Sequence, residues 1–505
     1  MRCALRTGTY TGRLSFLRRY LPLFTLAVAI FALYLYHLNG FGVIPPDEPR
    51  YAAIGQSMAH TGDWVTPKLW GSPWFEKPPL LYWMTGLGTM AGLGPELSGR
   101  FPVALLSIGF LIASFFLLRR EFGDEAAFVS VTLLATSAGW LAFSQLCLTD
   151  LPMSVFFSLA VFLALPFLRR ELSRRETRYR LAGMGACLGL GMLAKGLVPI
   201  ALALPLVWFL RRWWRSWWIA IAACILVAGP WYGAVYQING FRFIDEFFIK
   251  HHFERLYSAS LQHVQPWYYY LPVLLAGLFP WTPLLGLLLR KGTPWDQCRQ
   301  FLLAVSLFGM FLFSASLNKL PGYLLPLFPS IFVLIGAQFA EKPFPQLRRA
   351  WLVGCACLIA VIPLLAYVLP KALAVGRLSW PVLGSALTGL TRTELFYIAL
   401  PIMVIILARR SWTPTLLVLS LVAGAFYLKV KSDPILDKTV SARGLWREIQ
   451  PISGSICQDW VGRDWLYGLQ FYRGSEIPPC GNGKGFSYIL RPSGHKPPVV
   501  VPAHQ

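Results

Sequence analysis

The sequence predicts an all-α polytopic membrane protein with about 13 transmembrane helices, followed by a small C-terminal α/β domain. Of the 505 residues, 56% are hydrophobic and only 14% are charged, whereas soluble domains carry about 25% charged residues. Many apolar stretches approach the roughly 20 residues that cross a bilayer. From residue 430 onward the apolar pattern ends, which indicates a separate polar unit.

The chain is strongly basic, with 46 Lys and Arg against 23 Asp and Glu and a net charge of +23. Nucleic-acid binding is one interpretation of this excess. The positions of the charges favour another, because cytoplasmic loops of membrane proteins are rich in Lys and Arg. An anionic lipid substrate would account for part of the excess. We expect membrane lipid, and no nucleic acid, as a partner.

We expect the first element to be a retained signal anchor, because a basic N-terminus precedes an apolar run that has no clear cleavage site. Glycines and a lysine in "GMLAKGL" divide one long run into two spans. The predicted spans are 20–38, 101–118, 125–144, 151–168, 181–194, 197–210, 217–236, 269–289, 301–317, 321–340, 350–369, 395–408 and 413–428.

The charges of the loops test this order of spans. With the N-terminus inside, all loops on the cytoplasmic side are basic, among them "RRELSRRETRYR" and "RRWWR", as the positive-inside rule requires. The opposite side then holds the long loops 39–100 and 237–268. The apolar, glycine-rich "PPLLYWMTGLGTMAGLG" in the first of these loops is expected to lie in the membrane interface.

Two domains follow from this pattern: residues 1–429, which hold the spans and both long loops, and residues 430–505 outside the membrane. In the second domain, "SYILRP" and "PPVVVPA" are typical of strands and "SARGLWREIQ" of a short helix. Cys457 and Cys480 would form a disulfide if this domain lies in an oxidising compartment.

Charged side chains gather at span ends on the outer side, where polar groups tend to be functional. Arg and Lys among them suit a phosphate, and carboxylates would orient those cations, hold a metal or transfer protons. They are Asp47, Glu48, Arg50, Glu76, Lys77, Asp150, Lys195, Lys250, His251, His252, Glu254, Arg255 and Lys319.

Each motif also has an ordinary structural interpretation. Asp47 and Asp150 would be helix N-caps, Glu76 and Lys77 a solvated turn, and Lys195 would extend to the lipid headgroups. A shared site explains why all of these charged residues lie on one side of the membrane. Separate structural roles for each of them explain this less well.

The "IKHHFER" segment would likewise be a solvated helix face. His251 and His252 are adjacent, so they point to different faces of a helix and do not serve one compact metal site. A metal site formed by one of these histidines and a carboxylate distant in sequence remains open. No P-loop, G-x-G-x-x-G, G-x-S-x-G or H-E-x-x-H motif occurs in the sequence, so we expect no nucleotide cofactor and a preformed energy-rich substrate.

Eight motifs occur in an order that resembles the bacterial lipid A aminoarabinose transferases, which belong with protein O-mannosyltransferases to the GT-C class of integral-membrane glycosyltransferases. The match runs from about residue 40 to 330. The motifs are "DEPRYA", "GDW…P", "FEKPPLLYW", "LTDLPMS", "GMLAKG", "HHFERL", "PWYYYLPVLLAGLFPW" and "NKLPGYLLPLFP".

The resemblance implies a multi-pass protein of the bacterial inner membrane with a periplasmic active face. It would transfer a sugar from undecaprenyl phosphate to an acceptor, with 4-amino-4-deoxy-L-arabinose and a lipid A phosphate as the first expectation. Another sugar, such as a hexose, passed to a glycan, lipid or protein is the alternative. We expect a monomer.

The resemblance also assigns roles to residues. Asp47 and Asp150 would be catalytic, and Glu76 with His252 would hold a divalent cation (Zn, or Mg or Mn). The donor phosphate would be bound by Arg50, Lys77 and Arg255. The substrate pocket would be lined by Glu48, Tyr82, Lys195, Lys319 and Tyr323.

Glycosyl transfer passes through an oxocarbenium-like transition state, and a phosphate leaving group needs charge stabilisation more than a proton. Asp47 would be the base for a hydroxyl acceptor, whereas a phosphate acceptor needs only orientation. Two other classes stay open. A transporter of lipid-linked sugars would carry charges at mid-bilayer and internal repeats, and a membrane scaffold would leave the charged cluster unexplained.

Overall fold

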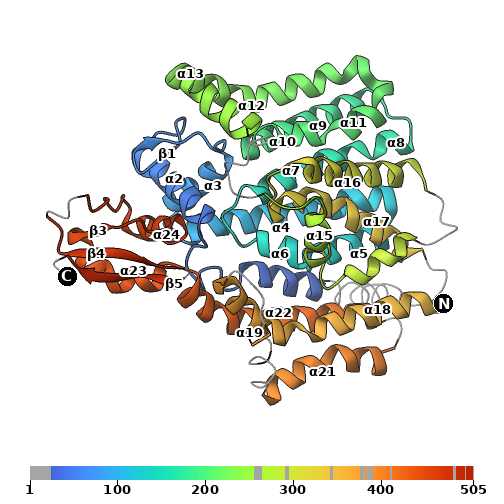
Figure 1. The fold of residues 1–505 in the computed structure, drawn as a ribbon. Coiled ribbons are helices and arrows are strands. Elements are labelled where there is room, and N and C mark those ends of the chain that lie inside the picture. Colours follow the sequence, from blue (N-terminus) through green and yellow to red (C-terminus); the bar gives the residue numbers. More distant parts are fainter. Residues whose placement is uncertain are drawn as a thin grey trace, which may run out of the picture.

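The computed structural model describes residues 24–254, 264–289, 295–341, 345–375, 380–381, 384, 391–409, 412–481, 485–494 and 496–503. Helices form a large bundle, and a small three-stranded sheet lies at one end of it (Figure 1). Within these ranges six helical segments are long and apolar enough to cross a membrane, or up to eight if each of two bent pairs is one span. The chain is therefore a mostly helical, multi-pass membrane protein.

The bundle is built around the long segments, three of which join neighbouring helices. They are α4 (Leu97–Phe122), α7 with α8 (Asp150–Ala164, Pro166–Arg169), η1 with α12 (Arg211–Ser216, Trp217–Asn239), α16 (Gln297–Ala315), η6 with α17 (Pro321–Leu327, Phe328–Ala340) and α22 (Thr413–Thr439). The bent pairs are η4–α15 with η5 (Trp267–Tyr269, Tyr270–Gly277, Thr282–Leu289) and α18 with α19 (Pro345–Ala360, Ile362–Val375).

Shorter or more polar helices occupy the other predicted spans, so the count of about 13 stays a prediction. They are Phe24–Leu35, α5 (Asp124–Ala135), α6 (Ala138–Phe143), α9 (Arg174–Lys195), α10 (Val198–Leu202), α11 (Leu204–Phe209) and α21 (Arg392–Leu407). The predicted break in "GMLAKGL" is confirmed, because α9 ends at Lys195 and Gly196 has φ +70°, a conformation that glycine adopts without strain.

The first long loop folds into α2 (Asp47–Thr61), a hairpin of β1 (Lys68–Leu69) and β2 (Ser72–Pro73), and α3 (Leu80–Met90). With 11 residues, α3 is too short to cross a bilayer. It packs closely on α2, since a Cβ atom at Gly55 would lie 2.5 Å from the Cβ of Thr85. The second long loop contains α13 (Phe241–Ile244) and the π-helix η2 (Asp245–Glu254).

The C-terminal elements are α23 (Arg443–Ile449), η7 (Gln450–Ser455), β3 (Ile456–Gln458), α24 (Arg463–Arg473), β4 (Tyr488–Ser493) and β5 (Lys496–Pro502). The sheet order is β3-β4-β5, with β3 parallel and β5 antiparallel to β4. The two predicted strands and the predicted helix are thus confirmed, and the disulfide between Cys457 and Cys480 is formed. We call residues 443–503 the C-terminal unit.

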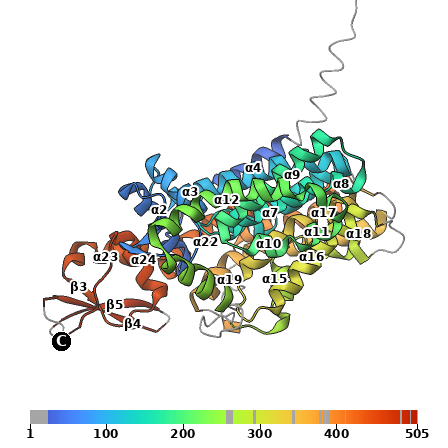
Figure 2. The ribbon, with the colours of Figure 1, turned by 90° about the horizontal axis from the view of Figure 1, so that it is seen from above.

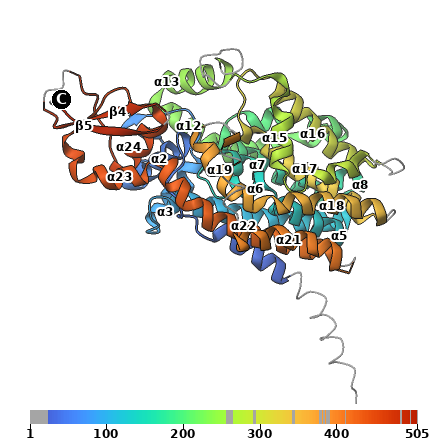
Figure 3. The same cartoon turned by 60° about the horizontal axis from the view of Figure 1, so that its bottom comes forward.

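The C-terminal unit has a small core of its own, which includes Ile456, Leu469 and Leu490. Figure 2 shows it at the end of the bundle, next to α2 and α3, and Figure 3 shows α22 leading along the bundle toward it. Helix α24 packs against α2. The unit therefore lies beside the loop segment that contains most of the predicted site residues.

Candidate active site

Four predicted site residues meet in one cluster, which we call the Arg50 cluster: Asp47, Arg50, Glu76 and Lys77. Arg50 Nη1 donates to Glu76 Oε2 at 2.8 Å, and Nη2 donates to Asp47 Oδ1. Lys77 Nζ donates to Glu76 Oε1 at 2.9 Å. Asp47 and Arg50 are three residues apart on α2 and so share a face, whereas Glu76 and Lys77 come from the segment between β2 and α3.

The Arg50 cluster is mostly enclosed, with Asp47 at its open side. The side chains of Arg50, Glu76 and Lys77 are 9–11% exposed, and that of Asp47 is 37% exposed. Burial alone would lower the pKa of Arg50, but Glu76 and Asp47 outweigh it and raise that pKa above its usual value. Arg50 therefore stays charged, as a phosphate ligand must.

The capping and solvated-turn interpretations of these motifs are wrong. The N-cap of α2 is Pro46 and that of α7 is Thr149, and neither helix start has a side-chain cap. Asp47 and Asp150 are instead the first helical residues, and both accept hydrogen bonds from cations. Nor is "FEKPP" a solvated turn, because its two charged side chains are largely buried.

Glu48 forms a second, fully enclosed ion pair with Arg100, the two lying 1% and 0% exposed. Arg100 Nε and Nη2 each donate to one Glu48 oxygen at 2.7 Å. The backbone N–H groups of Ile44 and Cys147 donate to the same two oxygens, at 2.6 and 2.9 Å. Glu48, expected in the substrate pocket, is thus held inside the protein, where it fixes the start of α2 beside α4 and the loop before α7.

A third group, the Asp150 pair, joins the first residue of α7 to the last residue of α9. Lys195 Nζ donates to Asp150 Oδ1 at 2.5 Å and lies 4.4 Å from the ring centroid of Tyr323. Lys195 is only 8% exposed, so its interpretation as a lipid-facing residue is wrong. Gly322 makes room for the pair, since a Cβ there would lie 2.5 Å from Asp150 Oδ1.

The Asp150 pair lies at the same end of the bundle as the Arg50 cluster. Cys147 is hydrogen-bonded to Glu48, which follows Asp47 directly. Three residues span at most about 11 Å, so Asp150 is close to this anchor. Both predicted catalytic carboxylates thus lie within three residues, along the chain, of the groups that meet at this buried ion pair.

Tyr82 and Lys319, two other predicted pocket residues, are both buried. The Tyr82 ring lies 6.1 Å from that of Tyr51, and its hydroxyl has no hydrogen-bond partner among the described residues. Burial raises the pKa of Tyr82 well above its usual value and Glu76 raises it further, so it is a neutral donor. Lys319 Nζ donates to the carbonyl groups of Gln265 and Ser316, at 3.0 and 2.5 Å, and so ties two segments together.

Arg255, expected at the donor phosphate, lies outside the described residues, and His252 is described only as part of the backbone of η2. Within the described residues no group of three or more His, Cys, Asp or Glu side chains is arranged to hold a metal ion. Both carboxylate oxygens of Glu76 already accept hydrogen bonds, from Arg50 and Lys77. Each of these oxygens keeps a second lone pair, and the His252 side chain lies outside the described residues, so the cation at Glu76 and His252 stays a prediction.

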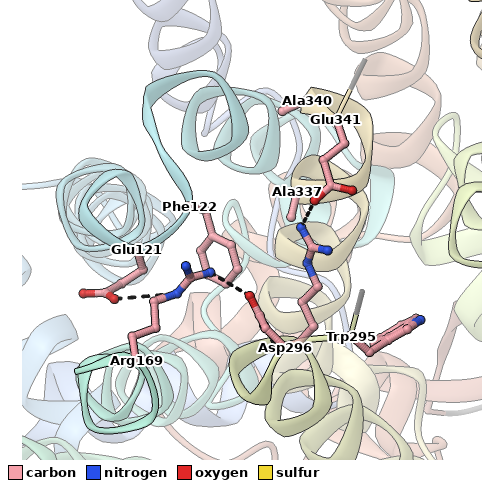
Figure 4. Close-up of a pocket in the computed structure, with 9 residues that line it drawn as sticks. Glu121, Phe122, Arg169, Trp295, Asp296, Ala337, Ala340 and Glu341 are labelled. Atoms are coloured by element: carbon pink, nitrogen blue, oxygen red, sulfur yellow. Dashed lines mark hydrogen bonds and ion pairs between the residues drawn. The ribbon is translucent and has the colours of Figure 1, made fainter. Parts of the chain in front are cut away.

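A polar pocket of about 500 Å³ lies at the end of α4 that is away from the Arg50 cluster. Figure 4 shows the side chains that line it. The 26 residues of α4 extend about 39 Å. Arg169 pairs with Asp296 at 3.0 Å and with Glu121 at 4.0 Å, and Arg299 pairs with Glu341. These charges join the ends of four helices.

Two features of the site were not predicted from the sequence. One is Arg100, whose signal was present: an arginine at the head of the apolar run "RFPVALLSIGF" needs a buried partner. The other is the approach of α24, whose Tyr467 ring lies 5.4 Å from the guanidinium carbon of Arg50. Arg50 and Tyr467 are so far apart in the sequence that no local sequence pattern indicates their contact.

Residues 20–254 match the family model described as dolichyl-phosphate-mannose-protein mannosyltransferase. The chain is 35% identical over 340 residues to undecaprenyl phosphate-alpha-4-amino-4-deoxy-L-arabinose arabinosyl transferase 2 of Pseudomonas fluorescens, covering 64% of this chain and 56% of that protein. It is 34% identical over 334 residues to the corresponding transferase of Pseudomonas aeruginosa, covering 63% and 59%. The aligned part is therefore less than two thirds of either relative.

The fold is similar over nearly the whole chain to crystal structures of ArnT from Cupriavidus metallidurans. The structure bound to undecaprenyl phosphate has a TM-score of 0.75 and 22% identity, and covers 98% of each chain. The apo structure has a TM-score of 0.72, 22% identity and coverage of 95% and 87%. At this identity the likeness concerns the fold.

Proposed function

We propose that this chain, which matches the protein mannosyltransferase family model over residues 20–254 and is similar to the aminoarabinose transferases, transfers a sugar from undecaprenyl phosphate to an acceptor. The first candidate sugar is 4-amino-4-deoxy-L-arabinose, and the first candidate acceptor is a phosphate of lipid A. The observation that carries this proposal is the Arg50 cluster, in which two cations are held by two carboxylates at an enclosed site.

In the reaction the bond between sugar C1 and the donor phosphate oxygen breaks, and its electron pair stays on that oxygen. An acceptor oxygen forms the new bond to C1. Arg50 and Lys77 would stabilise the negative charge that develops on the leaving phosphate. The two positive and two negative charges of the cluster cancel. A bound phosphate would therefore take the place of a carboxylate beside one cation, or its charge would be balanced by an additional cation, for which Arg255 is the candidate.

The more exposed Asp47 faces the acceptor in this scheme. With a hydroxyl acceptor it would take the proton, whereas a phosphate acceptor is already anionic and would need orientation only. Asp150, held by Lys195 at 2.5 Å, would position the polar end of one substrate. Tyr82 would donate its hydroxyl hydrogen to a substrate oxygen, since that group has no partner within the described residues.

For the placement in the cell we propose the inner membrane, with about 13 spans and the Arg50 cluster on the periplasmic side. The division into a transmembrane domain (1–429) and a periplasmic domain (430–505) is proposed with it, although α22 runs through this limit to Thr439. The disulfide between Cys457 and Cys480 supports an oxidising compartment for the C-terminal unit.

Incubating the purified full-length protein in detergent with undecaprenyl-phosphate aminoarabinose and lipid A tests the proposal. We expect a mass increase of lipid A by one aminoarabinose, which needs no sealed membrane. A product only with another polyprenyl-phosphate sugar or acceptor would support the alternative substrates. If no donor gives a product and the protein moves the donor across the membrane of sealed vesicles, the protein is a transporter and the proposal is overturned.

A further inference from the structure

The C-terminal unit reaches the Arg50 cluster through one face of α24. Tyr467 and Gln470 are three residues apart and therefore share that face. The Tyr467 ring centroid lies 5.4 Å from Arg50 Cζ. Gln470, which is 5% exposed, accepts a hydrogen bond at 2.9 Å from Trp70 Nε1 in the turn between β1 and β2. The helix thus rests on the same loop region that supplies Glu76.

A second set of contacts fixes the C-terminal end of the same helix. The Tyr472 hydroxyl donates to Glu96 Oε1 at 3.0 Å and accepts from the backbone N–H of Val43 at 3.1 Å. The disulfide between Cys457 and Cys480 encloses the whole of α24 in its loop. The position of Tyr467 beside Arg50 is therefore set by the hydrogen bonds of Gln470 and Tyr472 and by the disulfide loop around the helix.

Arg50 lies among three aromatic rings that come from three separate segments. Besides Tyr467, the rings of Tyr51 and Trp74 have their centroids 5.7 and 5.6 Å from Arg50 Cζ. Such distances are within the range of cation–π attraction, and a planar guanidinium stacks on aromatic faces as an ammonium group does not. Tyr51 and Trp74 belong to the loop 39–100, whereas Tyr467 comes only from the C-terminal unit.

We propose that Tyr467 is a positioning residue for sugar transfer, whose ring holds the Arg50 guanidinium in the orientation that receives the donor phosphate. This inference rests on the proposed function and assigns the C-terminal unit a part in it. The unit completes the enclosure of Arg50, and the contact uses the ring of Tyr467 rather than its hydroxyl.

The full-length protein in detergent provides the test, with undecaprenyl phosphate as the binding probe and the transfer reaction as the second readout. We expect Tyr467→Ala to weaken undecaprenyl phosphate binding and to lower kcat/KM for the donor by roughly 3- to 30-fold. KM for the acceptor should stay unchanged. Tyr467→Phe, which keeps the ring, should restore both donor values to within about twofold of the original protein.

Tyr488→Ala is the matched control, because Tyr488 packs on the core of the same unit from strand β4. If Tyr488→Ala weakens donor binding as much as Tyr467→Ala, the effect comes from the stability of the unit, and the inference is overturned. It is also overturned if Tyr467→Ala binds undecaprenyl phosphate normally while the original protein binds and transfers. Failure of the original protein to bind or transfer would instead contradict the proposed function.

Discussion

Replacing Glu48 by glutamine tests whether this residue builds the site from within or contacts substrate. Each Glu48 oxygen accepts two hydrogen bonds, from Arg100 and from a backbone N–H group. Glutamine replaces one of these oxygens by an NH₂ group, which donates and therefore cannot accept the two hydrogen bonds that the oxygen accepts. Hydrogen bonds to charged groups contribute roughly 1.5–3 kcal/mol each, so the loss of two predicts destabilisation by about 3–6 kcal/mol. Breaking a buried ion pair typically costs about as much.

Thermal unfolding of the detergent-purified variant measures this loss of stability. Undecaprenyl phosphate binding, measured at a temperature where the variant is folded, shows whether Glu48 also contacts the substrate. We expect Glu48→Gln to have a lower Tm and nearly normal binding per folded molecule. The control is Glu246→Gln, which breaks a partly exposed pair with Arg242 at 2.9 Å and should cost at most about 1 kcal/mol. A variant with unchanged Tm and lost donor binding would refute this reasoning and return Glu48 to the pocket.

Three further predictions concern other parts of the site. Gly322→Ala should displace the Asp150 carboxylate and lower kcat/KM by up to roughly 100-fold. The control Gly454→Ala changes a position with open space around it and should leave kcat/KM unchanged. Equal kcat/KM values of the two variants would count against a role for the Asp150 pair. Replacing Cys457 and Cys480 by serine should destabilise the C-terminal unit by about 2–4 kcal/mol, seen as faster limited proteolysis after residue 440, and unchanged cleavage would contradict it. If a divalent cation binds at Glu76 and His252, EDTA should lower transfer, and Zn²⁺ or Mg²⁺ should restore it. Transfer unchanged by EDTA would contradict this expectation.

The fold class and most of the Arg50 cluster could be predicted because their signals are local. Apolar runs mark buried or membrane helices whatever their neighbours are, and Gly196 marks the end of α9 in the sequence itself. Asp47 and Arg50 share a face by their spacing alone. Glu76 and Lys77 could be added because charges are costly near a membrane and need partners there.

Contacts between distant segments could not be predicted in this way. The donors that hold Glu48 come from residues 44, 100 and 147, so no single stretch shows that its carboxylate is fully occupied. The capping interpretation of Asp47 is wrong because the helix begins one residue earlier than that interpretation needs: Pro46 is the N-cap, and the Asp47 carboxylate accepts a hydrogen bond from Arg50. Helix α24 has an amphipathic sequence that fits any surface, and only the packed structure places it on α2.

The most direct test of the central claim is the transfer of aminoarabinose from undecaprenyl phosphate to lipid A by the purified protein and two lysine variants. Lys77 is 9% exposed and belongs to the Arg50 cluster, whereas Lys68 is 35% exposed and pairs with Asp63 at 2.9 Å outside it. We predict that the original protein and Lys68→Ala transfer the sugar and that folded Lys77→Ala does not. Full turnover by Lys77→Ala would contradict the assignment of the Arg50 cluster as the donor-phosphate site.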